Sequence, residues 1–314
     1  MKPFAMVFPG QGSQSVGMLG AWAEHAEVQR TLQQANDALG EDLAALIANG
    51  PAEALALTTN TQPVMLAANV AIYRAWLAAG GAEPALLAGH SLGEYAAWVV
   101  AQSLDLGDAL RLVRLRAQAM QQAVPVGQGA MAAVLGLEAA RVTEVCQSVQ
   151  ASVGAGQVVQ AVNFNDPSQT VIAGSADAVA QAIEALKAAG AKRALPLPVS
   201  APFHSSLMQP AAEQLAQALE QVAVAPPRIP VVNNVDVAQV TEPAAIRQAL
   251  VRQAAQPVRW VECVQAMAAQ GIGVMAECGP GKVLTGFGKR ITPQAVSVSL
   301  AQPAGFDELR ESLQ

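Results

Sequence analysis

The fold is decided by the stretch Gly89-His90-Ser91-Leu92-Gly93, which reads Gly-x-Ser-x-Gly. An apolar run over residues 84–88 leads into it, and good helix-forming residues over 95–102 follow it. This is the pattern of a nucleophile elbow, in which a strand turns sharply into a helix and exposes a serine. Glycines two residues before and after the serine suit this turn, because a side chain at either position would collide with neighbouring backbone. The stretch therefore predicts Ser91 as a nucleophile at a strand-to-helix turn.

The composition is that of a folded protein that stays in water. Hydrophobic residues make up 52% of the 314 residues, but no run approaches the roughly 20 apolar residues that a membrane helix requires. Residues 1–9 carry one positive charge and a short apolar core, which is too little for a signal peptide. Cys146, Cys263 and Cys278 are odd in number and widely spaced, as expected for buried thiols in a reducing compartment. We expect a cytoplasmic protein with no membrane association.

Three further classes of site lack their signatures. The net charge is −6 and aromatic residues are few, so the basic, stacking surface of a nucleic-acid binder is missing. The histidines His25, His90 and His204 are far apart, and no known metal motif contains them, so no metal is expected. A glycine-rich loop over residues 10–12 follows the first apolar run, but Ser15 stands where a dinucleotide fingerprint has its third glycine.

Apolar strands alternate with helical patterns in both outer parts of the chain. Strands are expected over 4–8, 84–88, 229–232, 274–277 and 296–300, and helices over 62–79, 95–102, 108–123, 244–253, 258–269 and 282–289. This alternation predicts the α/β class, with a mostly parallel sheet covered by helices on both faces.

The central part of the chain has a different character. Its pattern is a strand (131–135), a helix (138–149), two strands (158–164 and 170–173), a helix (176–188) and a strand (192–197). The order βαββαβ is that of a ferredoxin-like module. We therefore expect residues 127–197 to be inserted into a larger domain formed by residues 1–126 and 198–314.

Arg116 is out of place on its helix. At 100° per residue it falls on the apolar side of the 108–123 helix, between Leu112 and Met120. A buried guanidinium needs an anion, because burying an unpaired charge is costly. The sequence leaves two partners open, which are a protein carboxylate and the acid group of a substrate.

His204 is the best candidate for a general base. It follows a proline-constrained loop and precedes a helix, whose N-terminus disfavours the imidazolium form. His25 lies in a polar stretch, and His90 is the immediate neighbour of Ser91, so its side chain points to the opposite face.

Several ordered motifs together resemble the malonyl-CoA:acyl carrier protein transacylase family, and they cover essentially the whole chain. They are FPGQGSQ at 8–14, GHSLGEY at 89–95, Arg116, NFN at 163–165, PVSAPFH at 198–204, Gln253 and GPGKVL at 279–284. The resemblance implies an α/β-hydrolase-like large domain that carries a ferredoxin-like insertion. It also implies transfer of a malonyl group from coenzyme A to the phosphopantetheine thiol of acyl carrier protein in fatty acid synthesis, with malonyl-CoA as substrate and no cofactor.

The resemblance also implies roles for individual residues. Ser91 would carry the malonyl group as an ester, and His204 would act as acid and base. The backbone N–H groups of Gln11 and Leu92 would hold the oxyanion. Arg116 would bind the malonyl carboxylate through two hydrogen bonds.

Three residues are expected to support this site. Gln253, with neighbouring backbone carbonyl groups, would orient His204, since the family has no acidic third member of a triad. Phe203 resembles the bulky residue of malonyl-selective members, although many stand-alone bacterial members have Ser before the histidine. Met120, one turn beyond Arg116, completes the expected set.

Local basic patches on the surface would bind the acidic carrier protein. The candidates are Lys187, Lys192, Arg193, Lys282, Lys289 and Arg290.

Two other functions stay open. One is a discrete acyltransferase of a polyketide or polyunsaturated fatty acid pathway, which would keep all of the chemistry, and the other is a serine hydrolase or thioesterase. A hydrolase of the α/β class usually has its histidine near the end of the chain, whereas 110 residues follow His204 here.

Overall fold

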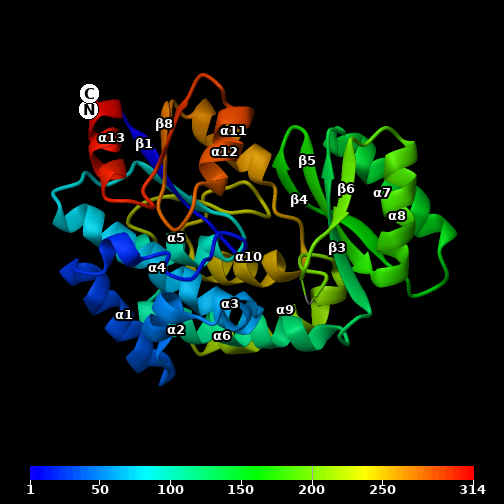
Figure 1. The fold of residues 1–314 in the computed structure, drawn as a ribbon, viewed down its shortest axis with the longest axis horizontal. Coiled ribbons are helices and arrows are strands. Elements are labelled where there is room, and N and C mark those ends of the chain that lie inside the picture. The colour runs from blue at the N-terminus through cyan, green and yellow to red at the C-terminus, as the bar shows by residue number, and fades with distance from the viewer. Residues whose placement is uncertain (200) are drawn as a thin grey trace.

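A computed structural model describes residues 1–199 and 201–314. Ser200, which belongs to the 198–204 motif, lies outside the described residues. The larger sheet has the strand order β7-β2-β1-β8-β9, and every described pair in it is parallel. Its strands are β1 (Phe4–Phe8), β2 (Leu86–Gly89), β7 (Val231–Val232), β8 (Val274–Glu277) and β9 (Val296–Ser299). This parallel sheet confirms the predicted fold class (Figure 1).

The two faces of the larger sheet have different covers. Phe4, Met6 and Phe8 of β1 point into a core with helices on one face, while Ala5 and Val7 pack on the other face. The core on the first face is built with side chains from α1 (Ala26–Leu39), α4 (Thr58–Ala78), α5 (Gly93–Val100), α6 (Leu106–Ala123), α9 (Gln209–Glu220), α10 (Pro243–Ala255) and α13 (Ala304–Ser312). The second face is covered by α11 (Trp260–Ala269) and α12 (Val283–Ile291).

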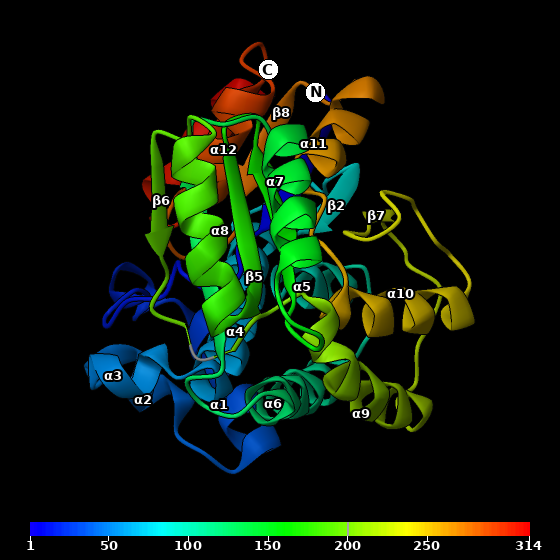
Figure 2. The same cartoon turned by 90° about the vertical axis from the view of Figure 1, so that its right-hand side faces the viewer.

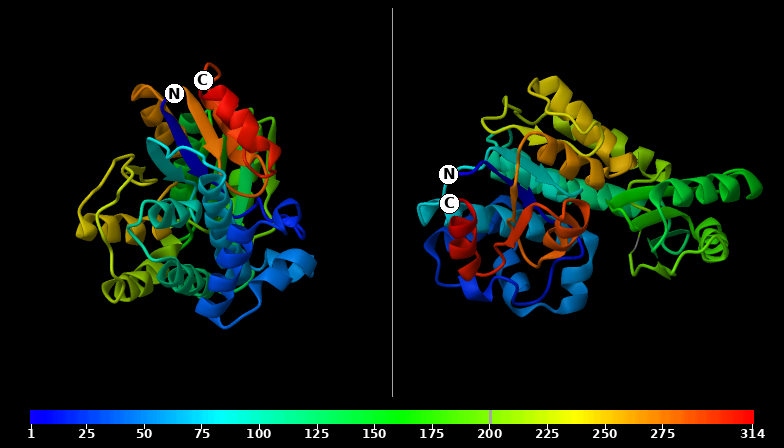
Figure 3. Two further views of the ribbon diagram at one scale, coloured as in Figure 1. Left: turned by 90° about the vertical axis from the view of Figure 1, so that its left-hand side faces the viewer. Right: turned by 90° about the horizontal axis from the view of Figure 1, so that it is seen from above.

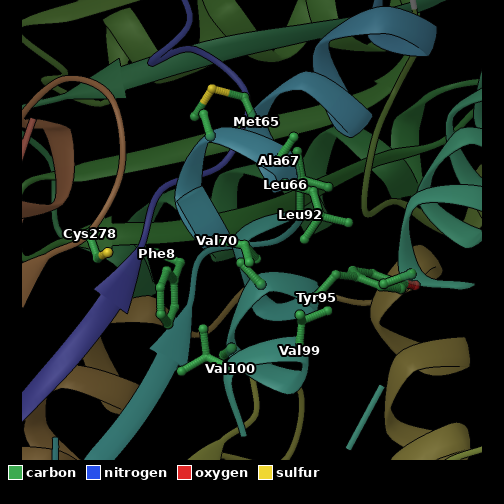
Figure 4. Packing of buried hydrophobic residues seen from close by; sticks show 14 of the residues in the cluster. Phe8, Met65, Leu66, Ala67, Val70, Leu92, Tyr95, Val99, Val100 and Cys278 are labelled. Atoms are coloured by element: carbon green, nitrogen blue, oxygen red, sulfur yellow. The ribbon is translucent and has the colours of Figure 1, made fainter. Parts of the chain in front are cut away.

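The elbow rests on the first of these cores. Figure 4 shows Phe8 of β1 close to Val70 of α4 and Val100 of α5, with Leu92 and Tyr95 nearby. Burial of each large apolar side chain contributes about 1.5–3 kcal/mol, so the strand before the elbow and the helix after it are held firmly. Four short elements complete the outer shell: η1 (Gly20–Trp22), α2 (Leu43–Asn49), α3 (Ala52–Ala56) and η2 (Ser206–Met208).

The smaller sheet has the order β4-β5-β3-β6, and all its described pairs are antiparallel. Its elements are β3 (Gly129–Leu135), α7 (Ala139–Ser152), β4 (Val159–Asp166), β5 (Gln169–Ser175), α8 (Ala176–Ala188) and β6 (Arg193–Pro196). The two helices lie side by side on one face of the sheet (Figure 2). The element order is the predicted βαββαβ, whereas the boundaries at residues 126/127 and 197/198 stay a prediction.

The smaller sheet is tied to the larger unit along the edge of β4. Val258 donates its N–H to Val162 O (2.8 Å), and its carbonyl accepts from Phe164 N (3.0 Å). Arg290 Nε lies 2.7 Å from the buried carboxylate of Asp166. Figure 3 shows the smaller sheet and its helices at one end of the molecule.

This edge explains one departure from the sequence-based expectation. A helix was expected over 258–269, but α11 begins at Trp260, because the backbone of Val258 is engaged with β4. The strand expected over 229–232 is reduced to Val231–Val232. Among the described helices, none is both long and apolar enough to cross a bilayer.

Candidate functional site

Ser91 occupies a strained elbow between β2 and α5. Its φ is +52°, in the left-handed region that non-glycine residues rarely adopt. A Cβ at Gly89 would lie 1.9 Å from Gly93 C, and one at Gly93 would lie 2.0 Å from Phe8 O. Both glycines are therefore required by close backbone approach, which is the arrangement that the Gly-x-Ser-x-Gly pattern predicts.

His204 lies against Ser91. The Ser91 Oγ to His204 Nε2 distance is 2.6 Å, and His204 Nδ1 lies 2.8 Å from the backbone carbonyl oxygen of Gln253. A carbonyl oxygen only accepts, so Nδ1 carries the proton and Nε2 is free to accept from the serine hydroxyl. Burial, followed by the nearby charge of Arg116, lowers the pKa of His204 to about 3. The imidazole is therefore neutral at pH 7.

Gln253 meets His204 through its backbone and not through its side chain. The sequence predicted that the residue and its neighbouring carbonyls would orient the histidine, and the carbonyl oxygen that does so is its own. Its side-chain amide donates from Nε2 to Ser91 O (2.9 Å), while Oε1 accepts from Arg116 Nη2 (3.0 Å). One residue thus contacts the histidine, the serine backbone and the arginine.

Arg116 lies buried beside the serine. Its guanidinium donates to Gln62 Oε1 (2.8 Å), Gln253 Oε1 (3.0 Å) and Ser91 Oγ (3.2 Å), and it lies over the Tyr95 ring. Among the described residues, the carboxylates in ion pairs are bound by other cations, and none pairs with Arg116. Of the two partners left open by the sequence, a directly paired protein carboxylate is therefore wrong for the described residues.

Gln11 and Leu92 line the same cavity as Ser91 and His204. Leu92 precedes α5, and Gln11 lies in the loop after β1; neither N–H has a protein acceptor among the described residues. The Gln11 loop is held in place, because its side-chain Oε1 accepts from Thr58 Oγ1 (2.9 Å) and Asn69 Nδ2 donates to Pro9 O (2.9 Å).

These groups line a cavity of about 450 Å³ between the two sheets. It contains the predicted residues Gln11, Ser91, Leu92, Arg116, Met120, Phe203 and His204. Met131, Asn163 and Val171 of the smaller sheet form the opposite wall. The volume is within the range of small-molecule sites.

The two other histidines have partners other than the serine. His90 lines the same cavity as Ser91, but its Nε2 lies 2.8 Å from Asn165 Oδ1 on β4. His25 accepts from Glu27 N at the start of α1. Within residues 1–199 and 201–314, no group of three or more His, Cys, Asp or Glu side chains could hold a metal.

Three residues of the site were missed from the sequence. Gln62 binds Arg116; Asn234 accepts from Ser91 N (2.8 Å) and donates to Gly89 O (2.7 Å). Glu94 is fully buried and accepts from Gln253 Nε2 (3.0 Å) and Asn234 N (2.9 Å). The available signal for Glu94 was an acidic residue in the first turn of a helix that is otherwise apolar.

Comparison with known proteins gives a consistent result. The family model described as "Acyl transferase domain" matches residues 5–306. A malonyl CoA-acyl carrier protein transacylase of Escherichia coli is 53% identical, with 98% of each chain covered. An acyl-carrier-protein S-malonyltransferase structure from Burkholderia pseudomallei has a TM-score of 0.96 and 60% identity, covering 99% of this chain and 100% of the other.

One further solved structure bears on partners. It holds a malonyl-transacylase in complex with a type II PKS acyl-carrier protein, and it is 50% identical with a TM-score of 0.95 and 99% coverage of both chains.

Proposed function

Because the chain belongs to the acyl transferase family, we propose that it moves malonyl groups from coenzyme A to the thiol of acyl carrier protein through an ester on Ser91. One observation carries the assignment of the site. Arg116, a buried cation with no ion-pair partner among the described residues, and His204, a neutral imidazole, lie 3.2 and 2.6 Å from the same serine oxygen. This arrangement suits an acyl group that ends in a carboxylate, because His204 can activate Ser91 for attack while Arg116 binds the carboxylate of the same group.

In the first half-reaction the Ser91 hydroxyl attacks the thioester carbon of malonyl-CoA. His204 Nε2 takes the hydroxyl proton as the O–C bond forms. The negative charge on the former carbonyl oxygen is held by the N–H groups of Gln11 and Leu92. The C–S bond then breaks, and His204 returns the proton to the coenzyme A sulfur, which leaves the malonyl ester on Ser91.

In the second half-reaction the carrier-protein thiol attacks this ester. His204 takes the thiol proton, the C–O bond breaks, and the proton passes to Ser91 Oγ. Throughout, Arg116 binds the malonyl carboxylate, which offers two oxygens to a planar guanidinium. Gln62 and Gln253 hold the guanidinium in place.

Substrate selectivity has a proposed basis in the cavity wall. Phe203 and Met120 both line the cavity beside the reacting groups. A bulky Phe203 leaves less room for a branch on the acyl chain, which favours malonyl over methylmalonyl.

Carrier-protein docking is proposed at the exposed mouth beside α12. Lys282 immediately precedes α12, and its neighbour Val283 lines the cavity. Two of the expected basic residues are already paired, since Arg290 binds Asp166 and Lys187 binds Glu184. Lys282 is exposed and next to a residue of the cavity lining, so it is the cation we propose for an acidic partner.

We place the reaction in fatty acid synthesis in the cytoplasm, with no cofactor. The three cysteines are buried and free, as suits a reducing compartment. A polyketide setting is the second candidate, because the solved complex with a type II PKS carrier is among the similar structures. It would use the same residues and a different carrier.

The test is loading with radiolabelled malonyl-CoA in the absence of carrier protein. We expect one malonyl group on the Ser91 peptide by mass spectrometry, followed by its transfer on addition of a fatty-acid-synthesis carrier protein. Rapid release of free malonate with no acyl-enzyme would instead indicate a hydrolase. Transfer to a polyketide carrier but not to a fatty-acid carrier would favour the second candidate.

A further inference from the structure

Glu94 is a buried carboxylate that the proposed mechanism leaves unused. It lies in the first turn of α5 with 0% exposure. Its carboxylate accepts from Gln253 Nε2 (3.0 Å), Asn234 N (2.9 Å) and Trp98 Nε1 (3.3 Å). All three partners are neutral donors, so its charge is stabilised without a direct ion pair. Burial raises the pKa of Glu94 to about 7, against the effect of these hydrogen bonds.

The position of this carboxylate determines how the Gln253 amide is oriented. On one side of the amide lie two acceptors, Glu94 Oε2 and Ser91 O, and on the other lies the Arg116 guanidinium, a donor. With Nε2 toward the acceptors, every contact joins a donor to an acceptor. A flipped amide would set its NH₂ group against the guanidinium and its oxygen against the carboxylate and the carbonyl.

We propose that Glu94 is a positioning residue for the acyl carboxylate: it fixes the Gln253 amide with its oxygen toward Arg116, and so holds the guanidinium for the malonyl group. This inference rests on the proposed function. The chain Glu94–Gln253–Arg116 places the carboxylate one side chain away from the cation, and it is ionised above its pKa of about 7. Within these three residues only the neutral Gln253 oxygen contacts the guanidinium, so the Glu94 carboxylate does not bind the guanidinium directly. A directly paired carboxylate would compete with the substrate for those groups.

The variant Glu94→Gln tests whether Glu94 positions Arg116 for malonyl groups or only supports the fold. The variant keeps the size of the side chain but removes the charge. Its single oxygen can take the place of Oε2 and accept from Gln253 and Asn234, so the bond to Gln253 is no longer charge-assisted, and Trp98 faces an NH₂ group that cannot accept. We expect kcat/KM for malonyl-CoA loading to fall by about 10- to 100-fold, as for loss of a charged buried hydrogen bond. Loading from acetyl-CoA, which has no carboxylate, should fall by less than about threefold.

A double-mutant cycle distinguishes positioning from simple destabilisation. In an Arg116→Ala background, Glu94→Gln should cause no further loss of malonyl loading, because the group that it positions is absent. Gln253→Met gives a second route if Glu94→Gln does not fold, since it removes the amide but keeps the backbone carbonyl that binds His204. It should reproduce the selective malonyl loss.

Glu277→Gln is the matched control. Glu277 is also a buried glutamate bound by neutral donors, the N–H groups of Leu284 and Thr285, but it has no contact with Gln253 or Arg116. It should leave the ratio of malonyl to acetyl loading unchanged, even if stability falls.

The outcomes are distinct. Equal losses of malonyl and acetyl loading in Glu94→Gln, or an undiminished malonyl loss in the Arg116→Ala background, would overturn the positioning role. Absence of malonyl loading in the unmodified protein would instead overturn the proposed function itself.

Discussion

Ser91 and His204 face each other at 2.6 Å, and both have left-handed backbone conformations, with φ angles of 52° and 63°. Two non-glycine residues in this region, in direct contact, indicate that the surrounding structure holds strain at the reacting atoms. Each such residue costs about 1–3 kcal/mol, which the packing of β2 and α5 offsets. This backbone conformation sets the half-buried Ser91 oxygen against His204 and Arg116.

This strain predicts that two inactive Ser91 variants differ in stability. Both Ser91→Ala and Ser91→Gly should abolish malonyl loading, because neither has a nucleophile. Ser91→Gly should be more stable than Ser91→Ala by about 1 kcal/mol, since glycine adopts positive φ without a Cβ penalty. Urea unfolding of the two variants measures the difference, with the exposed Ser152→Ala of α7 as a control. A Ser91→Ala protein that still loads malonate would exclude Ser91 as the nucleophile.

Arg116→Ala should discriminate between acyl groups. Loss of the guanidinium should lower kcat/KM for malonyl-CoA by at least about 30-fold, the cost of removing one partner of a buried charged pair. Acetyl-CoA loading should fall far less. Arg111→Ala is the matched control, because Arg111 lies on the same helix but is exposed and paired with Asp108. Equal losses for the two substrates would remove the carboxylate-binding role.

Gly93→Ala should destabilise the fold by about 2 kcal/mol or more. Its Cβ would lie 2.0 Å from Phe8 O, so β1 and α5 would have to separate. At Gly154 a Cβ would meet no atom within 4 Å, and Gly154→Ala should therefore change stability by less than about 1 kcal/mol. Urea unfolding of both variants tests the elbow geometry, and similar values would show that the close approach is not required.

Lys282→Glu tests the carrier-docking face. We expect a rise of about fivefold or more in KM for acyl carrier protein, with kcat/KM for malonyl-CoA loading of Ser91 much less affected. The rise should shrink at high salt, because the interaction is exposed. Lys2→Glu makes the same charge change where the chain starts, away from the cavity. An identical response of the two variants would place the docking face elsewhere.

The sequence predicted the elements that local pattern determines. The elbow, the alternation of strands and helices, and the out-of-place Arg116 each follow from periodicity or turn chemistry over a few residues. The contacts that hold Arg116 depend on the fold, because Gln62 and Gln253 come from α4 and α10. No spacing in the sequence brings these two amides together.

The orienting group of His204 shows a second limit. Every residue has a backbone carbonyl, so the sequence cannot show which carbonyl binds His204 Nδ1. A search for an acidic third member of a triad would not find it. Glu94 was visible in the 89–95 motif, but its contact with Gln253 depends on how α5 and α10 pack. Local patterns predicted Ser91, His204 and Arg116, and the family resemblance added Gln253. The contacts of Gln62, Asn234 and Glu94 were missed, because they depend on how distant helices and loops pack.

The pH dependence of acylation should reveal the charge coupling between His204 and Arg116. Burial, followed by the nearby positive charge of Arg116, lowers the pKa of His204 to about 3. Above that pKa the imidazole is neutral and can act as a base. The fall of kcat/KM on the acid side of the pH profile, its acid limb, should therefore lie well below the ordinary histidine value of about 6.5.

A neutral donor, the acetyl thioester of N-acetylcysteamine, avoids titration of the coenzyme A phosphates in this measurement. Arg116→Ala removes a nearby positive charge, which favours the imidazolium form, so the limb should move upward toward 6.5, while Arg111→Ala should leave it in place. A limb near 6.5 in the unmodified protein, or one that Arg116→Ala does not move, would show that His204 is not held neutral by these two causes.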